Sequence, residues 1–277
     1  MAAKNLINGK DCDQIEIFDR ALQYGDGIFE TIPIQNRKIL CIDEHLDRLE
    51  KGCERIKISI PDKSIIKNEI SSLIDTNDQA VIKIIISRGQ GERGYKIPDN
   101  IKPTRIISIF PWPDYSKEFS KSGIKTKVCS YRYSNNSVLA GVKHLNRLEQ
   151  ILARGEWSDN DIAEGIVMNS DNYVIEGTMS NIFCIINKIL YTPDLSLCGI
   201  EGIVRDKIIN LSNKFGFKIE IKKITLDFLL NAEEIFMCNS LIGIWPVNSI
   251  DGKLFLEHKE TEKIKNKLME LNFIPEL

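Results

Sequence analysis

Lys143 is the residue of this sequence best suited to covalent chemistry. It follows Ala140-Gly141-Val142, which reads as the edge of an apolar strand. Burial beside apolar neighbours disfavours a charged ammonium, so it lowers the pKa of a lysine and frees the amine to form a Schiff base. A lysine in such a place more commonly buries its aliphatic stem and keeps its ammonium in water, and Lys143 on its own fits that description too.

Two later segments offer groups that bind an anion. Gly202-Ile203-Val204 begins a predicted helix, where backbone N–H groups and the helix dipole attract a phosphate. Asn239-Ser240 follows the predicted strand EIFMC and would add a hydroxyl and further N–H groups. The sequence therefore indicates an anion-binding site in addition to a reactive lysine.

Residues 89–94 match the glycine pattern G-x-G-x-x-G directly after a predicted strand. In a dinucleotide-binding fold these glycines open a helix, but here Pro98 and Pro103 follow, and no crossover helix fits before the next strand. We therefore expect a glycine-rich hairpin loop, with a purely structural turn as the alternative. The loop would bring three side chains towards a substrate: Arg88, Arg93 and Tyr95.

Hydrophobic periodicity and turn residues predict the elements that position these groups. In the first half they are a strand pair around Asn8-Gly9, a hairpin at Asn36-Arg37, a helix capped by Asp43 and ended by Pro61, a second helix through Leu73, and strands at 80–87 and 104–110. In the second half they are a strand at 123–130, a helix at 146–157 with Leu148, Ile151 and Leu152 on its inner face, several strands, and helices near 203–215 and 258–271.

A domain boundary is predicted where Pro111-Trp112-Pro113 can continue neither a helix nor a strand. We expect a small N-terminal α/β domain at 1–115, a linker at 116–120 and a larger C-terminal domain at 121–277 with a mostly β core flanked by helices. The fold class is α/β, or α+β.

Composition excludes several classes of protein. Lys and Arg (37) nearly balance Asp and Glu (39) and are scattered, so no nucleic-acid-binding surface is indicated. There is no apolar run of membrane-span length and no signal-peptide core, so we expect no membrane partner and a cytoplasmic location. The seven cysteines read as reduced, and the three histidines lack the spacing of a metal site.

Five segments carry a resemblance in order and spacing. They are 19–31 (DRALQYGDGIFET), 44–49 (EHLDRL), 141–150 (GVKHLNRLEQ), 176–183 (EGTMSNIF) and 202–206 (GIVRD). Together they resemble the fold-type IV pyridoxal-phosphate enzymes, a family that includes branched-chain and D-amino-acid aminotransferases and aminodeoxychorismate lyases. The resemblance runs from about Asn8 to Asp251. It implies the fold of that family and a homodimer in which a loop of the small domain reaches the neighbouring site.

The resemblance also implies a role for individual residues. Lys143 would hold pyridoxal 5'-phosphate as a Schiff base, and Glu176, 33 residues later, would face the pyridine nitrogen and keep it protonated. Arg48 would bind the phosphate, and Ile200 would pack on one face of the ring. The other cofactor-binding residues are Gly202, Ile203, Val204, Asn239 and Ser240, and the substrate-binding residues are Arg88, Arg93, Tyr95 and Phe29.

Within the family, the finer sequence is most similar to the aminodeoxychorismate lyases. The runs GxKHLNRLEQ, QYGDG and SRGQGERGY carry this similarity, and the residues after Lys143 lack the tyrosine of branched-chain aminotransferases. Glu30 is shared with the aminotransferases. The resemblance implies conversion of 4-amino-4-deoxychorismate to 4-aminobenzoate and pyruvate; the alternative is an aminotransferase of D- or branched-chain amino acids with the same Lys143 and Glu176.

Overall fold

The computed structural model describes residues 4–74 and 78–276. Its contacts divide the chain into an N-terminal unit, Met1–Pro113 with Val142–Asn146, and a C-terminal unit, Asp114–Gly141 with Arg147–Leu277. The sequence prediction placed residues 121–277 in one domain, whereas the short segment that contains Lys143 groups with the N-terminal unit. The reason is backbone pairing, because this segment runs beside a strand of the N-terminal sheet.

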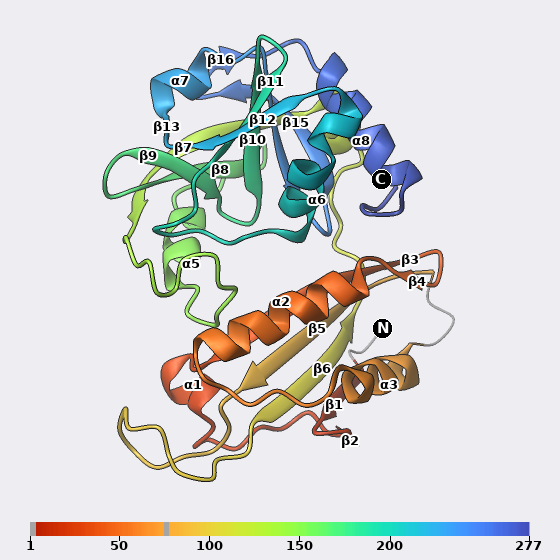
Figure 1. Cartoon of the computed structure of the whole chain (residues 1–277), viewed down its shortest axis with the longest axis vertical. Coiled ribbons are helices and arrows are strands. Elements are labelled where there is room, and N and C mark those ends of the chain that lie inside the picture. Colours follow the sequence, from red (N-terminus) through yellow and green to blue (C-terminus); the bar gives the residue numbers. More distant parts are fainter. Residues whose placement is uncertain (1–3, 75–77, 277) are drawn as a thin grey trace. The chain divides into compact units, whose positions relative to one another are not determined.

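The N-terminal unit is built on a six-stranded antiparallel sheet in the order β2-β1-β6-β5-β3-β4 (Figure 1). Its strands are β1 (Lys4–Ile7), β2 (Lys10–Asp11), β3 (Gly27–Gln35), β4 (Lys38–Ile39), β5 (Gln79–Ser87) and β6 (Thr104–Phe110). Both predicted hairpins are confirmed. Their turn residues, Asn8-Gly9 and Asn36-Arg37, all have positive φ, which two-residue hairpin turns require.

Three helices accompany this sheet: α1 (Arg20–Tyr24), α2 (Ile42–Arg55) and α3 (Lys63–Leu73). The apolar faces of α2 and α3 pack with the isoleucines of β3, β5 and β6 into one core. The prediction that Asp43 caps the first of these two helices is wrong, because Cys41 holds the N-cap position and Asp43 lies in the first turn. The helix also ends before Pro61, since Lys57 adopts a positive φ and turns the chain.

The C-terminal unit contains a mixed ten-stranded sheet that curls into a nearly closed barrel. Its order is β12-β11-β10-β14-β15-β7-β8-β9-β13, with β16 paired to β15. The strands are β7 (Ile124–Tyr133), β8 (Ile162–Asn169), β9 (Tyr173–Gly177), β10 (Asn181–Ile186), β11 (Ile189–Pro193), β12 (Lys218–Lys222), β13 (Ile224–Thr225), β14 (Glu234–Asn239), β15 (Gly243–Ile250) and β16 (Lys253–Leu254). The α/β fold class expected from the sequence is confirmed.

Short helices surround this sheet: α4 (Glu118–Ser122), α5 (Leu148–Arg154), α6 (Ile203–Leu211), α7 (Leu226–Leu230) and α8 (Lys259–Glu270), with a 3₁₀ turn at Ser212–Phe215. Two clusters form most of the core. One gathers around Trp245 and Met237, and the other contains the stacked rings of Phe183 and Phe236 together with residues of α6 and α8. The predicted linker at 116–120 is partly helical, because Phe119 of α4 packs edge-on against Trp245.

The inner face predicted for the helix after Lys143 is wrong. Leu148, Ile151 and Leu152 of α5 are 66%, 64% and 50% exposed, and the residue of this helix that is buried is Ala153. Ala153 packs in a cluster with Trp157 and Cys129. Apolar residues at helical spacing predict that one face of the helix is buried. They do not predict whether that face packs against the same chain or against another one.

Candidate active site

The backbone of residues 143–145 is held against the strand β3. Phe29 N donates to Lys143 O over 3.0 Å, and Leu145 N donates to Gly27 O over 2.9 Å. Strand β4 pairs only with the far end of β3, at Ile34 and Gln35, so the Gly27–Phe29 end of that edge is open to this segment. Lys143 is therefore positioned by main-chain hydrogen bonds to the open edge of β3, whose other edge is paired with β5 along its whole length.

The side chain of Lys143 lies on an aromatic ring. Its Nζ is 4.3 Å from the centroid of the Phe29 ring, a distance at which an ammonium is attracted to the ring face. The preceding residue, Val142, is buried in the N-terminal core. Phe29, which was expected to contact substrate, thus contacts the candidate nucleophile itself.

A buried cluster of three polar side chains lies on the same strand and the facing helix. Glu30 of β3 is fully buried, and its carboxylate binds Arg48 through two hydrogen bonds, Nε to Oε1 at 2.8 Å and Nη2 to Oε2 at 2.7 Å. His45 Nδ1 lies 2.6 Å from Glu30 Oε2. His45 and Arg48 are three residues apart on α2, so both reach the same carboxylate.

Burial and charge set the protonation states in this cluster. Burial by itself would raise the pKa of Glu30, but the charge of Arg48 and the hydrogen bonds from Arg48 and His45 lower it to about 2. Burial lowers the pKa of His45 below its ordinary value, against the opposing effect of Glu30; the charge of Lys143 lowers it further. A neutral His45 with its proton on Nδ1 donates to Glu30. The Glu30 carboxylate also binds Arg48 through two hydrogen bonds and so holds the guanidinium in a fixed orientation.

Glu176 lies in the C-terminal unit, at the end of β9, and is 3% exposed. Its Oε2 accepts hydrogen bonds from Ile200 N at 2.9 Å and from Asn181 Nδ2 at 3.2 Å. The neighbouring Gly199 has a φ of +91°, and a Cβ there would come within 2.8 Å of Ile175. Glycine is therefore needed for the segment that contains Ile200 to come close enough to bind the carboxylate.

The N-terminus of α6 is the expected anion site. Gly202 is its N-cap and cannot supply a capping side chain, and a Cβ there would lie 2.0 Å from Asn181 Oδ1. The side chains of Ile203 and Val204 are buried in the unit, so these two residues would bind a ligand through their backbone N–H groups. The Asn181 side chain binds Glu176, and its Oδ1 lies close to Gly202. It thereby links the residue expected at the ring nitrogen to the helix N-terminus expected at the phosphate.

Asn239 ends β14 next to the start of β10, because Cys238 and Asn181 pair across the two strands. Its Oδ1 accepts from the backbone N–H groups of Leu241 and Ile242, and its Nδ2 donates to Met179 O. The amide of Asn239 is thus used to shape the turn that presents Ser240, rather than being directed at a ligand.

Glu164 is a buried residue that the sequence analysis missed. Its carboxylate accepts hydrogen bonds from the backbone N–H groups of Thr178 and Met179 and from the hydroxyls of Thr178 and Ser180. It thereby fixes the turn between β9 and β10, which connects Glu176 to Asn181. The sequence did contain a signal, because an acidic residue inside the apolar run IAEGIVM would be buried and would need hydrogen-bond donors nearby.

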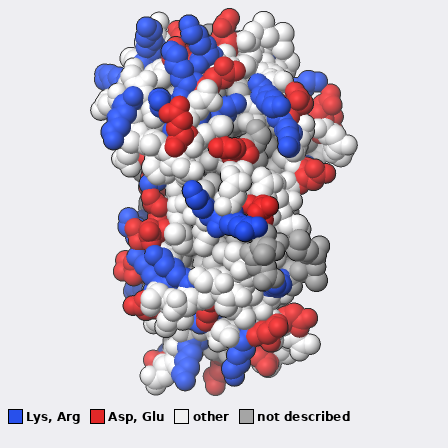
Figure 2. Space-filling model, turned by 90° about the vertical axis from the view of Figure 1, so that its right-hand side faces the viewer, with Lys and Arg blue, Asp and Glu red and all other residues white. Residues whose placement is uncertain are grey.

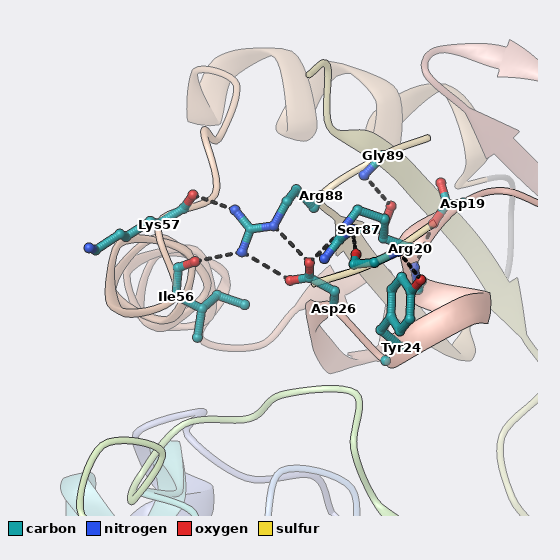
Figure 3. A network of polar contacts seen from close by, with 12 residues as sticks. Asp19, Arg20, Tyr24, Asp26, Ile56, Lys57, Ser87, Arg88 and Gly89 are labelled. Atoms are coloured by element: carbon teal, nitrogen blue, oxygen red, sulfur yellow. Dashed lines mark hydrogen bonds and ion pairs between the residues drawn. The ribbon is translucent and has the colours of Figure 1, made fainter. Parts of the chain in front are cut away.

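The glycine-rich segment after β5 is a loop, as predicted, and residues 88–103 contain no helix. Arg93 is exposed and Tyr95 is 88% exposed. Arg88 behaves differently, because it is 4% exposed and donates to Asp26 and to the carbonyls of Ile56 and Lys57 (Figure 3). This use of its donors contradicts the expected substrate contact of Arg88.

The structure thus collects the predicted residues into three groups. The N-terminal unit brings Lys143, Phe29 and Arg48 together with Glu30 and His45, and it separately presents Arg93 and Tyr95 on a loop. The C-terminal unit brings together Glu176, Ile200, Gly202, Ile203, Val204, Asn239 and Ser240.

Other classes of ligand would be indicated by groups of metal-binding side chains, by membrane-spanning helices or by a basic surface. Within residues 4–74 and 78–276, no three His, Cys, Asp or Glu side chains are grouped so that they could hold a metal ion. No helix in these ranges is both long and apolar enough to span a membrane. On the face shown in Figure 2, basic and acidic side chains are interspersed and form no continuous basic stripe.

Comparison with known proteins gives a consistent result. A model of the family described as "Amino-transferase class IV" matches residues 27–250. The chain is 36% identical over 247 residues to an aminodeoxychorismate lyase of Vibrio harveyi, covering 89% of this chain and 91% of that protein. It is 31% identical over 275 residues to a putative branched-chain-amino-acid aminotransferase of Methanocaldococcus jannaschii, covering 96% and 94% of the two chains.

Among solved structures, the 4-amino-4-deoxychorismate lyase of Pseudomonas aeruginosa superimposes with a TM-score of 0.91 at 35% identity. The match covers 96% of this chain and 98% of that one.

Proposed function

Because the chain belongs to the class IV aminotransferase family, we propose that it is a pyridoxal-phosphate-dependent lyase that converts 4-amino-4-deoxychorismate to 4-aminobenzoate and pyruvate. This reaction would supply 4-aminobenzoate for folate biosynthesis. The observation that carries the proposal is a contact between the two most lyase-like runs of the sequence. Asn146, which follows Lys143 where branched-chain aminotransferases have a tyrosine nearby, donates to Gly25 O of the QYGDG run over 2.9 Å.

The donor set fits pyridoxal phosphate, group by group. An aldehyde needs an amine, which Lys143 supplies; a phosphate needs a guanidinium and N–H groups, which Arg48 and the start of α6 supply. A protonated pyridine nitrogen needs a buried carboxylate, which Glu176 supplies. Gly202 supports the fit, because its missing side chain leaves the helix N-terminus without a cap of its own. We propose that Ile200 packs on the ring.

When bound, the cofactor supplies an electron sink for the charge that is left when a proton is removed next to the substrate nitrogen. The chain supplies the rest. Lys143 Nζ is the base that takes the proton from the carbon bearing the nitrogen, and the group that returns one. The Phe29 ring orients this amine, Glu30 orients Arg48, and Arg93 with Tyr95 binds a substrate carboxylate.

We further propose that the enzyme is a cytoplasmic homodimer. The N-terminal unit exposes Ile17, Phe18 and Leu22, each more than 60% exposed, beside the substrate loop, and α5 of the C-terminal unit exposes three more apolar residues. Apolar patches of this kind are typical of subunit interfaces. A cytoplasmic location fits the seven cysteines, none of which forms a disulfide bond.

A direct assay tests the reaction. The purified protein is incubated with enzymatically generated 4-amino-4-deoxychorismate, and 4-aminobenzoate and pyruvate are measured. Release of both products in equal amounts without an added keto acid is the expected result. Its absence, in a protein that carries the cofactor, would contradict the lyase proposal.

The second candidate is an aminotransferase, favoured by Glu30 and by the Methanocaldococcus relative. It would need a keto acid as second substrate, and its cofactor would be converted to the amine form by the amino acid and back to the aldehyde form by the keto acid. Incubation with branched-chain or D-amino acids alone, followed by absorption spectroscopy, detects that conversion.

The covalent role of Lys143 has its own test. Borohydride should abolish the visible absorption band and leave a phosphopyridoxyl group on a peptide that contains Lys143. A label on any other lysine would refute the assignment, whatever the substrate proves to be.

A further inference from the structure

The loop of residues 88–103 carries Arg93 and Tyr95, and two separate sets of contacts hold it. The base of the loop is hydrogen-bonded to the chain at the start of α1. Arg20 N donates to Gly89 O, and Gly91 N donates to Phe18 O. Gly89 has a φ of +100°, and a Cβ there would lie 2.0 Å from Lys102 O, so the two ends of the loop are in contact. These base contacts close the loop but do not determine where its tip points.

The tip is held at Gly94, between the two proposed substrate residues. Gly94 N donates to the hydroxyl of Tyr24 over 2.9 Å, and Gly94 O accepts from Arg20 Nη1 over 3.0 Å. The Tyr24 ring also meets the Tyr95 ring edge-on, with centroids 5.6 Å apart. The φ of Gly94 is +116°, so this backbone conformation favours glycine.

Arg20 is in turn fixed by the partly buried carboxylate of Asp26 (Figure 3). Asp26 Oδ2 accepts from Arg20 Nε at 2.9 Å and from Arg88 Nε at 2.7 Å. Both guanidinium groups are about 5% exposed or less, so the ion pairs are largely shielded from water. Burial alone would raise the pKa of Asp26, but the two arginines bring it below its ordinary value, which keeps the carboxylate charged.

Arg88 connects this carboxylate to the helix that carries His45 and Arg48. It donates to the carbonyls of Ile56 and Lys57, which follow the C-terminus of α2, where a cation is favoured by the helix dipole. A continuous chain of hydrogen bonds thus runs from α2 through Arg88, Asp26 and Arg20 to Gly94.

We propose that Arg20 and Tyr24 are positioning residues that set the place of the Arg93–Tyr95 tip and so determine the affinity for an anionic substrate. The proposal rests on the proposed function for the identity of that substrate. Neither residue contacts substrate in it; both act through the backbone of Gly94. The Asp26–Arg88 pair is the support that lets a buried arginine hold a flexible loop, since a lone guanidinium at this burial would be costly.

Tyr24→Phe is the sharpest variant, because it removes one hydroxyl and keeps the ring that packs on Tyr95. Loss of one hydrogen bond to the tip should raise KM about two- to tenfold and leave kcat within about twofold. The absorption spectrum of the bound cofactor should not change. Arg20→Lys should raise KM more, since a lysine cannot bind Asp26 and Gly94 O with one planar group. Tyr173→Phe, on β9 of the C-terminal unit, is the matched control and should leave KM unchanged.

A double-mutant comparison separates positioning from a general effect on the fold. In a background of Arg93→Ala with Tyr95→Ala, Tyr24→Phe should cause almost no further loss of kcat/KM, because the groups that it positions are gone. If Tyr24→Phe instead costs the same factor in both backgrounds, or lowers kcat with KM unchanged, the positioning role is wrong.

Limited proteolysis gives a readout that does not depend on the reaction. The tip offers trypsin two exposed sites, Arg93 and Lys96, and cleavage there should be at least about threefold faster in Tyr24→Phe than in wild type or Tyr173→Phe. Equal cleavage rates would overturn the inference even in an active lyase. If Tyr24→Phe is cleaved faster but the wild-type protein makes no 4-aminobenzoate, the result would support the positioning role of Tyr24 and refute the proposed function instead.

Discussion

At the scale of the residue, two carboxylates have similar burial and different partners. Glu30 is bound by a guanidinium and an imidazole, whereas Glu176 is bound by a backbone N–H and a side-chain amide. The negative charge of Glu30 is balanced by the positive charge of Arg48. Glu176 accepts from its two neutral donors and also interacts electrostatically with the partly buried Arg147, and the proposed cofactor would add the positive charge of its protonated ring.

Glu176→Gln should therefore retain the cofactor and lose most turnover. A neutral amide cannot hold a proton on the pyridine nitrogen, although it keeps nearly the same shape. The measurement is kcat beside the amount of bound cofactor, and wild-type kcat in the variant would show that the electron-sink role of Glu176 is wrong.

The low pKa of Glu30 predicts how stability depends on pH. Its folded-state pKa of about 2 lies below the ordinary glutamate pKa of 4.5, so its contribution is present above about pH 4.5 and is lost as the pH falls towards 2. That difference corresponds to roughly 3 kcal/mol. Denaturant unfolding of wild type and Glu30→Gln between pH 3 and 7 should give converging free energies of unfolding at low pH.

The exposed Glu257→Gln is the control for that series and should follow the wild-type curve. Parallel curves for wild type and Glu30→Gln, with no convergence, would mean that Glu30 is not the group that titrates.

At the scale of the element, the start of α6 and the β9–β10 turn form one assembly. Asn181 contacts Glu176, Ile200 and the position of Gly202, and Glu164 holds the turn that precedes Asn181. A small displacement of the helix N-terminus would therefore disturb the acceptor for the ring nitrogen as well as the phosphate site.

Gly202→Ala tests this assembly. Its Cβ would overlap Asn181 Oδ1, so either α6 or the Asn181 amide that binds Glu176 must shift, and cofactor affinity should fall about tenfold or more. Gly216→Ala is the contrasting control, because its Cβ would meet nothing within 4 Å but its φ of +85° is strained. That variant should lose about 1 kcal/mol of stability and keep wild-type cofactor affinity. Equal cofactor affinity in both variants would refute the phosphate role of α6.

At the scale of the whole molecule, the charge and the apolar surface bear on different partners. The net charge is −2, and on the face shown in Figure 2 the charged side chains are mixed in sign. The apolar side chains of Ile17, Phe18 and Leu22 are instead exposed close together in the sequence. They favour a second protein chain as the partner.

Phe18→Asp should weaken the proposed dimer. A charge in the centre of an apolar interface would have to be desolvated, so the dimer dissociation constant should rise at least about tenfold in sedimentation measurements. Leu256→Asp, at a residue that is 79% exposed elsewhere, is the control and should have no effect. An unchanged dimer in Phe18→Asp would place the interface on another surface.

The sequence by itself determined the parts that depend on local pattern. The two hairpin turns, the long strands β5 and β6, and the loop without a helix after residues 89–94 were all predicted correctly, because turn residues and prolines act on their own neighbours. The family also followed from the sequence, since its motifs keep their order and spacing.

Only the tertiary structure decided which side chains meet. That Arg88 binds Asp26, that Glu164 fixes a turn, and that α5 turns its leucines to the surface depend on contacts between segments far apart in the chain. The physical reason is that a charged or apolar side chain specifies only the kind of partner it needs. A loop arginine that needs a carboxylate is equally well satisfied by a substrate or by an aspartate 62 residues away, and the fold selects between them.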